Sequence, residues 1–200
     1  MSAEIPAGGT WFDTLKGRSF EDVPIVDGNI STEEFIRAAK SLVTLFDVIG
    51  GTGLSFVKSD MTGNIDKVEK RFQEAPAESQ TLQDLVNNEP GKKPASEGLL
   101  WLVRGLEFTA KALRHNLDNS SAELKTSFND AYEGSLKPHH NWFAKKAFGL
   151  AVGAVPTREK FYELLGGKQE QISGPMEQEV AALEKVVSIL KDFKPLQELK

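Results

Sequence analysis

The segment "GLLWLVRGLEFTAKALRHNL", residues 98–117, constrains the fold more than any other part of the sequence. Apolar residues would occupy nearly every side of a helix drawn through it. Only four charged residues interrupt this pattern: Arg104, Glu107, Lys111 and Arg114. A helix that is apolar all round is stable only where other elements cover it. The sequence therefore predicts a central helix over about 96–117 that is surrounded by other helices.

The rest of the sequence is also helical in its spacing. Over residues 31–49 the apolar positions recur at intervals of three and four, Ser31 and Glu34 are spaced as a capping box, and Gly50 and Gly51 are a stop signal. Similar patterns predict helices over 10–21, 55–74, 81–88, 121–136, 139–154, 158–165 and 175–193. The capping-box spacing of Ser120 and Glu123 and the run Ser173-Gly174-Pro175 support two of the helix starts. No stretch alternates apolar and polar residues well enough to predict a strand.

Together these patterns predict an all-α protein. A chain of 200 residues can bury roughly 70% of the surface that it exposes when unfolded, so one domain over 1–200 is expected. The loop over 87–98 contains two prolines but lacks the length and composition of an interdomain linker.

Composition excludes several classes of function. The net charge of −5 argues against a general nucleic-acid binder, and the absence of cysteine excludes disulfides, thiolate catalysis and cysteine-ligated zinc. The N-terminus does not resemble a signal peptide, and the longest apolar run, 147–155, is too short to cross a bilayer. We expect a soluble cytoplasmic protein that uses no cofactor.

A polar stripe is the first candidate site. Asp60, Asn64, Lys67 and Arg71 are spaced by four, three and four residues, so they share one face of the predicted helix 55–74. This face is either solvated or part of a binding site. Gly63 favours the second interpretation slightly, because a glycine inside a helix costs about 1 kcal/mol and can mark a close approach to the backbone.

The central helix offers a second candidate. Trp101, Gly105 and Phe108 fall on one side of it. Trp101 is either a core residue or an aromatic platform for a sugar or a base, with hydrogen-bonding groups such as Asp60, Asn64 and Lys67 around its edge.

The third candidate is "KPHHNWF", residues 137–143. Adjacent histidines on a helix would point about 100° apart, so His139 and His140 are a poor pair of metal ligands. No motif for a nucleophile or a phosphate-binding loop is present either. A single histidine can instead donate a hydrogen bond to a carbonyl. The segment that follows suits either the core or a membrane surface, through Trp142, Phe143, Lys145 and Lys146.

Four segments in this order resemble the glycolipid transfer protein family: "VKSDMTGNIDK" from Val57, "LLWLVRGLEF" from Leu99, "KPHHNWFAKKAF" from Lys137 and "AVPTREKFYELL" from Ala154. The start "MSAEIPAGGTWFDTLK" is similar to the fungal heterokaryon-incompatibility members. The resemblance implies a two-layer all-α sandwich whose interior accepts lipid chains.

It also implies roles for individual residues. Asp60, Asn64 and Lys67 would hydrogen-bond the first sugar and the ceramide amide, Trp101 would stack under that sugar, and His140 would bind the amide carbonyl. The apolar pocket for the chains would include Phe148, Ala151 and Val152. The transient membrane contact would include Trp142, Phe143, Lys145 and Lys146.

The resemblance also bears on the headgroup. Related ceramide-1-phosphate carriers have a lysine at the position of Asn64 and an arginine at that of Trp101. The neutral residues here favour a glucosyl- or galactosylceramide. We expect a non-enzymatic carrier of glycosphingolipids, since Asp60 has no evident carboxylate partner for glycoside hydrolysis. A glycolipid sensor or adaptor and a ceramide-1-phosphate carrier remain the alternatives.

Overall fold

The computed structural model describes residues 4–50 and 53–199, so Gly51, part of the predicted stop signal, lies outside the described residues. Helices make up most of this part of the chain. The α-helices are α1 Thr32–Leu42, α2 Leu45–Gly50, α3 Ser55–Glu74, α4 Leu82–Asn88, α5 Pro94–Asp118, α6 Leu124–Glu133, α7 Trp142–Gly153, α8 Arg158–Leu164, α9 Gln169–Asp192 and α10 Lys194–Gln197. The 3-10 helices are Trp11–Leu15, Phe20–Asp22, Pro76–Glu78 and Lys137–His139.

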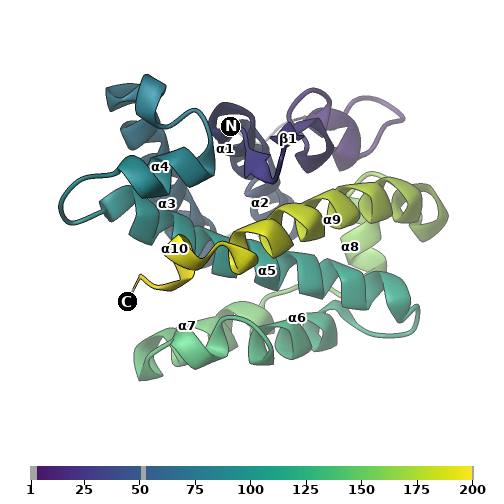
Figure 1. Cartoon of the computed structure of the whole chain (residues 1–200). Coiled ribbons are helices and arrows are strands. Elements are labelled where there is room, and N and C mark those ends of the chain that lie inside the picture. The colour runs from purple at the N-terminus through teal and green to yellow at the C-terminus, as the bar shows by residue number, and fades with distance from the viewer. Residues whose placement is uncertain (1–3, 51–52, 200) are drawn as a thin grey trace.

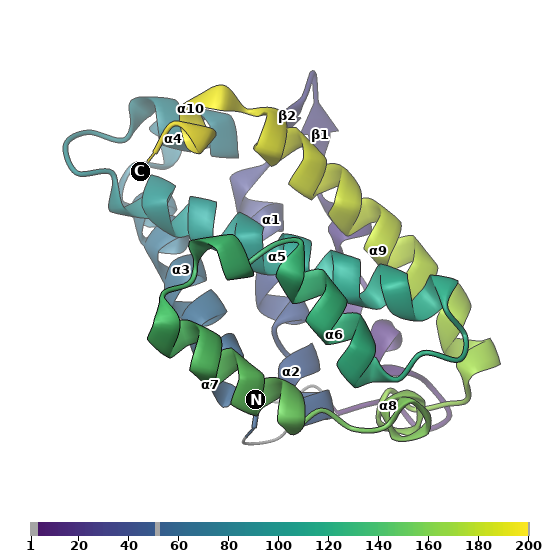
Figure 2. The ribbon, with the colours of Figure 1, turned by 90° about the horizontal axis from the view of Figure 1, so that it is seen from below.

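The predicted central helix is α5, which packs against α3, α6 and α9. In Figure 1, α6 and α7 lie below α5, and α1 and α4 lie above it; Figure 2 shows α5 between α3 and α9 from a second direction. Apart from half-buried Trp101, the apolar side chains of α5 between Leu99 and Leu113 are buried. The all-α sandwich predicted from the sequence is confirmed.

Gly98 allows α3 and α5 to approach each other closely. A Cβ atom placed on Gly98 would lie 3.0 Å from Cδ of Lys67 and 3.2 Å from the carbonyl oxygen of Asn64. The close approach suggested for Gly63 is wrong, because Gly63 is exposed and a Cβ atom there would have nothing within 4 Å.

The predicted helix over 10–21 is wrong. Two short 3-10 helices, Trp11–Leu15 and Phe20–Asp22, replace it, and Gly17 between them has a φ of +74°, which ends helical geometry. Buried Trp11 anchors this segment.

The predicted helix over 31–49 is divided into α1 and α2. The hydroxyl group of Thr44 donates to the carbonyl oxygen of Ser41 over 2.7 Å and accepts from Nε1 of Trp11 over 3.1 Å, which stabilises a turn between the helices. The expected capping box at Ser31 is absent, since its hydroxyl group bonds the carboxylate of Glu34 and caps no backbone N–H.

Two further helix starts differ from the prediction. Helix α6 begins at Leu124, three residues later than the expected 121, because the carboxylate of Glu123 accepts from the backbone N–H of Arg158 over 2.8 Å and is not available for a capping box with Ser120. Helix α9 begins at Gln169, so Pro175 lies inside the helix and not at its start. Helix α10 was not predicted.

A short antiparallel hairpin, β1 Ile25–Val26 and β2 Asn29–Ile30, corrects the expectation that the chain has no strand. Asp27 and Gly28 form its turn with φ angles of 51° and 79°. Asp-Gly is a preferred pair for a two-residue hairpin turn with positive φ angles, so this signal was present in the sequence.

Four of the other predicted helices agree with the structure. Helices α3, α4, α5 and α8 match their predicted ranges to within two residues, whereas α7 is shorter than 139–154 and leaves His139 and His140 ahead of it. Among the described residues, none of the helices combines the length and the apolarity that a membrane span requires.

Candidate functional site

A pocket of about 390 Å³ lies between α3, α5 and the segment that leads into α7. Its lining includes every residue that the sequence analysis assigned to headgroup binding: Asp60, Asn64, Lys67, Trp101 and His140. These residues come from three segments that are far apart in the sequence. Their meeting in one pocket is the main structural result for function.

Helix α3 supplies the polar wall. Asn64 is buried, with 5% of its surface exposed, and its side-chain oxygen accepts a hydrogen bond from Nζ of Lys67 over 3.1 Å. Asp60 lies one turn earlier on the same face and is exposed at the pocket. The wall therefore presents a carboxylate, an amide and an ammonium group side by side.

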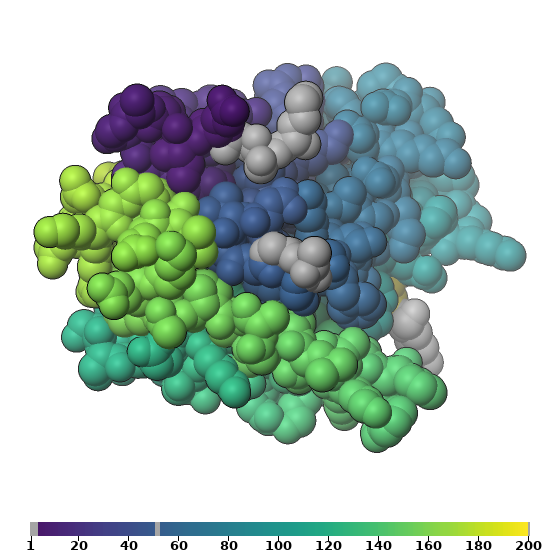
Figure 3. Space-filling model, turned by 180° about the vertical axis from the view of Figure 1, so that it is seen from behind, coloured from purple at the N-terminus to yellow at the C-terminus, as the bar shows by residue number. Residues whose placement is uncertain are grey.

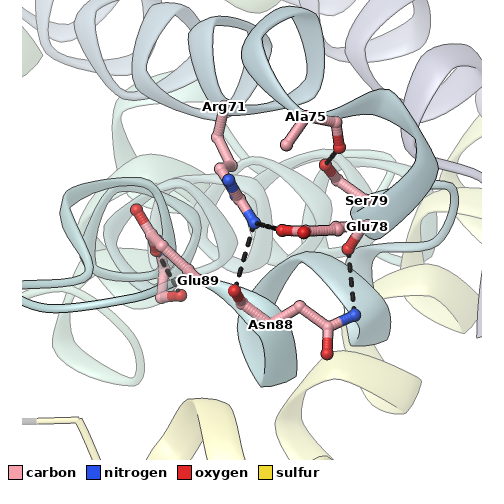
Figure 4. A network of polar contacts seen from close by, with 7 residues as sticks. Arg71, Ala75, Glu78, Ser79, Asn88 and Glu89 are labelled. Atoms are coloured by element: carbon pink, nitrogen blue, oxygen red, sulfur yellow. Dashed lines mark hydrogen bonds and ion pairs between the residues drawn. The ribbon is translucent and has the colours of Figure 1, made fainter.

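Arg71, the fourth residue of the predicted polar stripe, does not line the pocket. Its guanidinium group bonds the carboxylate of Glu78 over 2.6 Å and the carbonyl oxygen of Asn88 over 3.1 Å (Figure 4). It joins the end of α3 to the end of α4, so its role is structural.

Helix α5 supplies the aromatic wall. Trp101 is half-buried, and the guanidinium carbon of Arg104 lies 4.6 Å from its ring centroid. Gly105, one turn after Trp101, also lines the pocket, and Phe108 extends the lining further. The indole is therefore accessible from the pocket and contacts the guanidinium group of Arg104.

His140 completes the site from the third segment. It follows the 3-10 helix Lys137–His139 in extended geometry, and Asn141 then caps α7 by accepting from the backbone N–H of Ala144 over 3.0 Å. Its ring is within 25° of parallel to the indole of Trp101, at a centroid distance of 6.3 Å.

Burial lowers the pKa of His140 below its ordinary value of 6.5. The negative charge of Asp60 acts in the opposite direction, and the positive charges of His139 and Lys145 add to the lowering. His140 is therefore neutral at neutral pH, and a neutral imidazole has one donor nitrogen and one acceptor nitrogen.

The inner end of the pocket is aromatic. Phe148 lines the pocket together with Phe108, at a centroid distance of 5.4 Å, and stacks on Tyr132 at 3.6 Å with the rings 8° apart. Ala151 and Val152, the other residues predicted to contact lipid chains, are buried near Phe148 on α7 but do not line the pocket.

Helix α7 leaves large apolar side chains exposed. Trp142 is 65% exposed and Phe143 is 76% exposed, so the alternative that they are core residues is wrong. Lys145 and Lys146 are also exposed, and Nζ of Lys146 lies 5.4 Å from the ring centroid of Trp142.

Two neighbouring apolar residues were missed by the sequence analysis. Leu150 on α7 is 73% exposed and Phe56 on α3 is 52% exposed. Helix α7 lies beside the start of α3 on the surface in Figure 3. The exposure of Leu150 and Phe56 depends on how α7 and α3 pack, so no local sequence pattern could have identified these two residues.

One constellation resembles a catalytic triad. Nδ1 of His115 lies 3.0 Å from the hydroxyl oxygen of Ser127, and its Nε2 lies 3.3 Å from the carboxylate of Asp130. Ser127 has no exposed surface, so a substrate cannot reach its hydroxyl group. Within residues 4–50 and 53–199, no group of three or more acidic or histidine side chains is placed to hold a metal ion.

Comparisons with known proteins show which family the chain resembles. Residues 30–167 match the family described as "Glycolipid transfer protein (GLTP)". A glycolipid transfer protein of Aureobasidium melanogenum is 50% identical over 200 residues, which is 99% of each chain. The crystal structure of HET-C2, a fungal glycolipid transfer protein, has a TM-score of 0.88 and 46% identity and covers 92% of this chain and 96% of its own.

A structure that addresses how FAPP2 selects simple glycosphingolipids with the same fold has a TM-score of 0.84 and 31% identity, over 96% of this chain and 97% of its own. The family match covers more than half of the sequence, and the relative from Aureobasidium melanogenum extends over nearly all of it. The chain belongs to the glycolipid transfer protein family.

Proposed function

We propose that this protein is a non-enzymatic carrier that moves glycosphingolipids with neutral sugar headgroups between membranes, and that one domain over 1–200 carries this activity. The observation that carries the proposal is the meeting of a carboxylate, an amide, an ammonium group, an indole and an imidazole in one pocket. The names of the relatives from Aureobasidium melanogenum and of HET-C2 support the same function.

The sugar would bind between the two walls of the pocket. The apolar C–H face of a hexose stacks on the indole of Trp101, while its hydroxyl groups exchange hydrogen bonds with Asp60, Asn64 and Lys67. Asn64 and Lys67 are already hydrogen-bonded to each other, so these two side chains lose little conformational freedom when a ligand binds.

The ceramide amide would enter the pocket with both of its polar groups paired. A buried amide group without a partner costs about 1–3 kcal/mol, so a carrier needs one acceptor and one donor at this point. The carboxylate of Asp60 accepts from the amide N–H, and the imidazole of His140 donates to the amide carbonyl oxygen.

The chains would pass beyond Phe148 into the interior. About 30 methylenes exposed to water cost roughly 24 kcal/mol, which makes unassisted escape from a bilayer very slow. Phe148 lines the pocket, and Ala151 and Val152 are buried behind it on the same helix, so a shift of the aromatic cluster would open apolar surface to the chains.

The protein would meet the membrane through α7 and the start of α3. Indole and phenyl groups favour the interface of a bilayer, and nearby ammonium groups favour anionic lipids. Trp142 and Phe143 with Lys145 and Lys146 supply both, and the pocket opens beside them because Phe56 and Ala144 belong to its lining.

A phosphate headgroup fits this pocket less well. A phosphate dianion needs several charge-assisted donors, whereas the α3 wall supplies one ammonium group, from Lys67, and Asn64 and Trp101 are neutral. We therefore favour a neutral sugar over the phosphate of a ceramide-1-phosphate.

The test is the transfer of labelled galactosylceramide between vesicles, compared with ceramide-1-phosphate and phosphatidylcholine. We expect rapid transfer of galactosylceramide alone, and a loss of tenfold or more in Asp60→Val, because hydrogen bonds to charged groups contribute about 1.5–3 kcal/mol. Asp66→Val is the matched control, since Asp66 is exposed on the same helix and does not line the pocket.

Binding of galactosylceramide without transfer would contradict the carrier and favour a sensor or adaptor. If ceramide-1-phosphate is transferred as fast as galactosylceramide, the proposed preference for a neutral sugar headgroup is wrong.

A further inference from the structure

Tyr132, on α6, contacts the headgroup site, although the sequence analysis did not assign it to that site. Its hydroxyl oxygen lies 3.0 Å from Nδ1 of His140. Tyr132 is only 6% exposed. In the described part of the chain, Nδ1 of His140 is the hydrogen-bond partner of the Tyr132 hydroxyl group.

The direction of this hydrogen bond follows from burial. A hydroxyl proton that is removed from water without an acceptor costs about 1–3 kcal/mol, so the O–H of Tyr132 must donate, and Nδ1 must accept. An imidazole that accepts at Nδ1 has its own proton on Nε2. The opposite direction, donation from Nδ1 to the phenol oxygen, would leave the buried hydroxyl proton without a partner.

We propose that Tyr132 is a positioning residue for the headgroup site, which holds His140 in the Nε2–H tautomer and so makes Nε2–H the free donor at the pocket. The inference rests on the function proposed above, because a fixed donor matters only if His140 contacts a ligand. It specifies the ligand atom opposite His140 as an acceptor, such as an amide carbonyl oxygen.

The protonation states of both groups favour this arrangement. Burial lowers the pKa of His140, so its ring stays neutral and Nδ1 keeps its lone pair. Burial, and to a smaller extent the charge of Glu133, raises the pKa of Tyr132, so the phenol keeps its proton.

The phenol ring is itself held in place. It stacks on Phe148 at a centroid distance of 3.6 Å, and the ring of His140 stacks on Trp101 from the other segment. The phenol ring is therefore held by a contact that does not involve its hydroxyl group, so Tyr132→Phe removes the hydrogen bond and retains the packing.

The first measurement needs no ligand. Long-range ¹H–¹⁵N spectra of the histidine rings distinguish the two neutral tautomers, and His140→Gln assigns the signals. We expect the Nε2–H tautomer of His140 in the unmodified protein and a mixture of tautomers in Tyr132→Phe. Tyr162→Phe is the matched control: this buried hydroxyl group donates to Asn116 over 2.8 Å, away from the pocket, so its removal leaves the signals of His140 unchanged.

The second measurement is the Kd for galactosylceramide in the unmodified protein, Tyr132→Phe and Tyr162→Phe. We expect a five- to tenfold weaker Kd in Tyr132→Phe and an unchanged Kd in Tyr162→Phe, as for the loss of one hydrogen bond. An Nδ1–H tautomer in the unmodified protein, or an unchanged Kd in Tyr132→Phe, would overturn the inference. Absence of galactosylceramide binding in the unmodified protein would instead overturn the proposed function, while the tautomer result would stand separately.

Discussion

The sequence predicts on which side of α5 the indole of Trp101 lies, but not how deeply the indole is buried. The spacing of α5 indicates the side of the helix on which an indole lies, but its depth depends on what packs there. In the structure Trp101 is half-buried, with Arg104 against its ring and the pocket beside it. Trp11, by contrast, has no exposed surface.

We therefore expect Trp101→Ala to abolish glycolipid binding and to lower the free energy of unfolding by only about 1 kcal/mol, because little core packing is lost. The measurements are galactosylceramide binding and urea unfolding. Trp11→Ala provides the comparison, since removing a fully buried tryptophan costs about 3–5 kcal/mol. If both variants lose the same stability, Trp101 is a core residue and not a platform.

Glu179 is a buried carboxylate on α9, with 4% of its surface exposed. It accepts from the backbone N–H of Phe20 over 3.1 Å. Burial raises its pKa from 4.5 to about 7, that hydrogen bond opposes the rise, and the charges of Glu21 and Asp22 add to it.

Its effect on stability follows from the difference in protons bound. Between pH 4.5 and 7 the folded protein holds a proton that the unfolded chain has released, so the free energy of unfolding falls as the pH rises. The total is at most roughly 3 kcal/mol. We expect Glu179→Gln to match the unmodified protein near pH 4.5 and to be more stable above pH 7.

Urea unfolding at both pH values measures this difference. Glu170→Gln is the control, because Glu170 is exposed on the same helix. The raised pKa of Glu179 would be contradicted if Glu179→Gln and the unmodified protein differed in the free energy of unfolding by the same amount at both pH values.

At the scale of helices, the approach of α3 to α5 depends on Gly98 and not on Gly63. Both glycines lie within helices, and their local sequence context does not distinguish them. Only the packing shows that Gly98 faces Lys67 and the backbone of Asn64, whereas Gly63 faces open space.

We expect Gly98→Ala to destabilise the protein by about 1–3 kcal/mol, because the added Cβ atom forces α3 away from α5. It should also weaken glycolipid binding, since the displaced residues Asn64 and Lys67 line the pocket. Gly63→Ala is the matched control and should stabilise the protein by about 1 kcal/mol through helix propensity. Thermal unfolding and binding of both variants test this, and destabilisation by Gly63→Ala would count against it.

The helices that the sequence predicted well, α3, α4, α5 and α8, have start and stop signals close to their observed ends. Two of the failures, the break between α1 and α2 and the late start of α6, have a common cause. Thr44 bonds Trp11, 33 positions away, and Glu123 bonds the backbone of Arg158, 35 positions away. Such contacts decide where a helix breaks or begins, and they do not appear in a local window of sequence.

At the scale of the whole molecule, three segments meet in one pocket. The residues assigned to the headgroup from the family resemblance all line it, which spacing alone could not have established. Tyr132 was missed because its proposed role depends on one contact between α6 and His140 in the segment that leads into α7. Ala151 and Val152 were predicted to line the pocket, but of the three predicted chain-contact residues only Phe148, which stacks on Tyr132, lines it.

The exposed face of α7 leads to a prediction for the assembled protein on a membrane. We expect Trp142→Ala to weaken adsorption to vesicles about fivefold or more and to slow transfer, because an interfacial indole is lost. The selectivity among sugars should not change. Val26→Ala is the control, since Val26 is 67% exposed at the hairpin, which lies across the molecule from α7 in Figure 1. Vesicle co-sedimentation measures the effect, and equal adsorption of both variants would exclude Trp142 as an anchor.

The three tryptophans lie at three depths: Trp11 inside the core, Trp101 at the pocket and Trp142 in solvent. Each depth gives a different emission signal. Contact with a bilayer should shift the emission of Trp142 to shorter wavelength, a stacked sugar should change the quantum yield of Trp101, and Trp11 should respond to neither. Intrinsic fluorescence can therefore separate docking from headgroup recognition in time, without an attached dye.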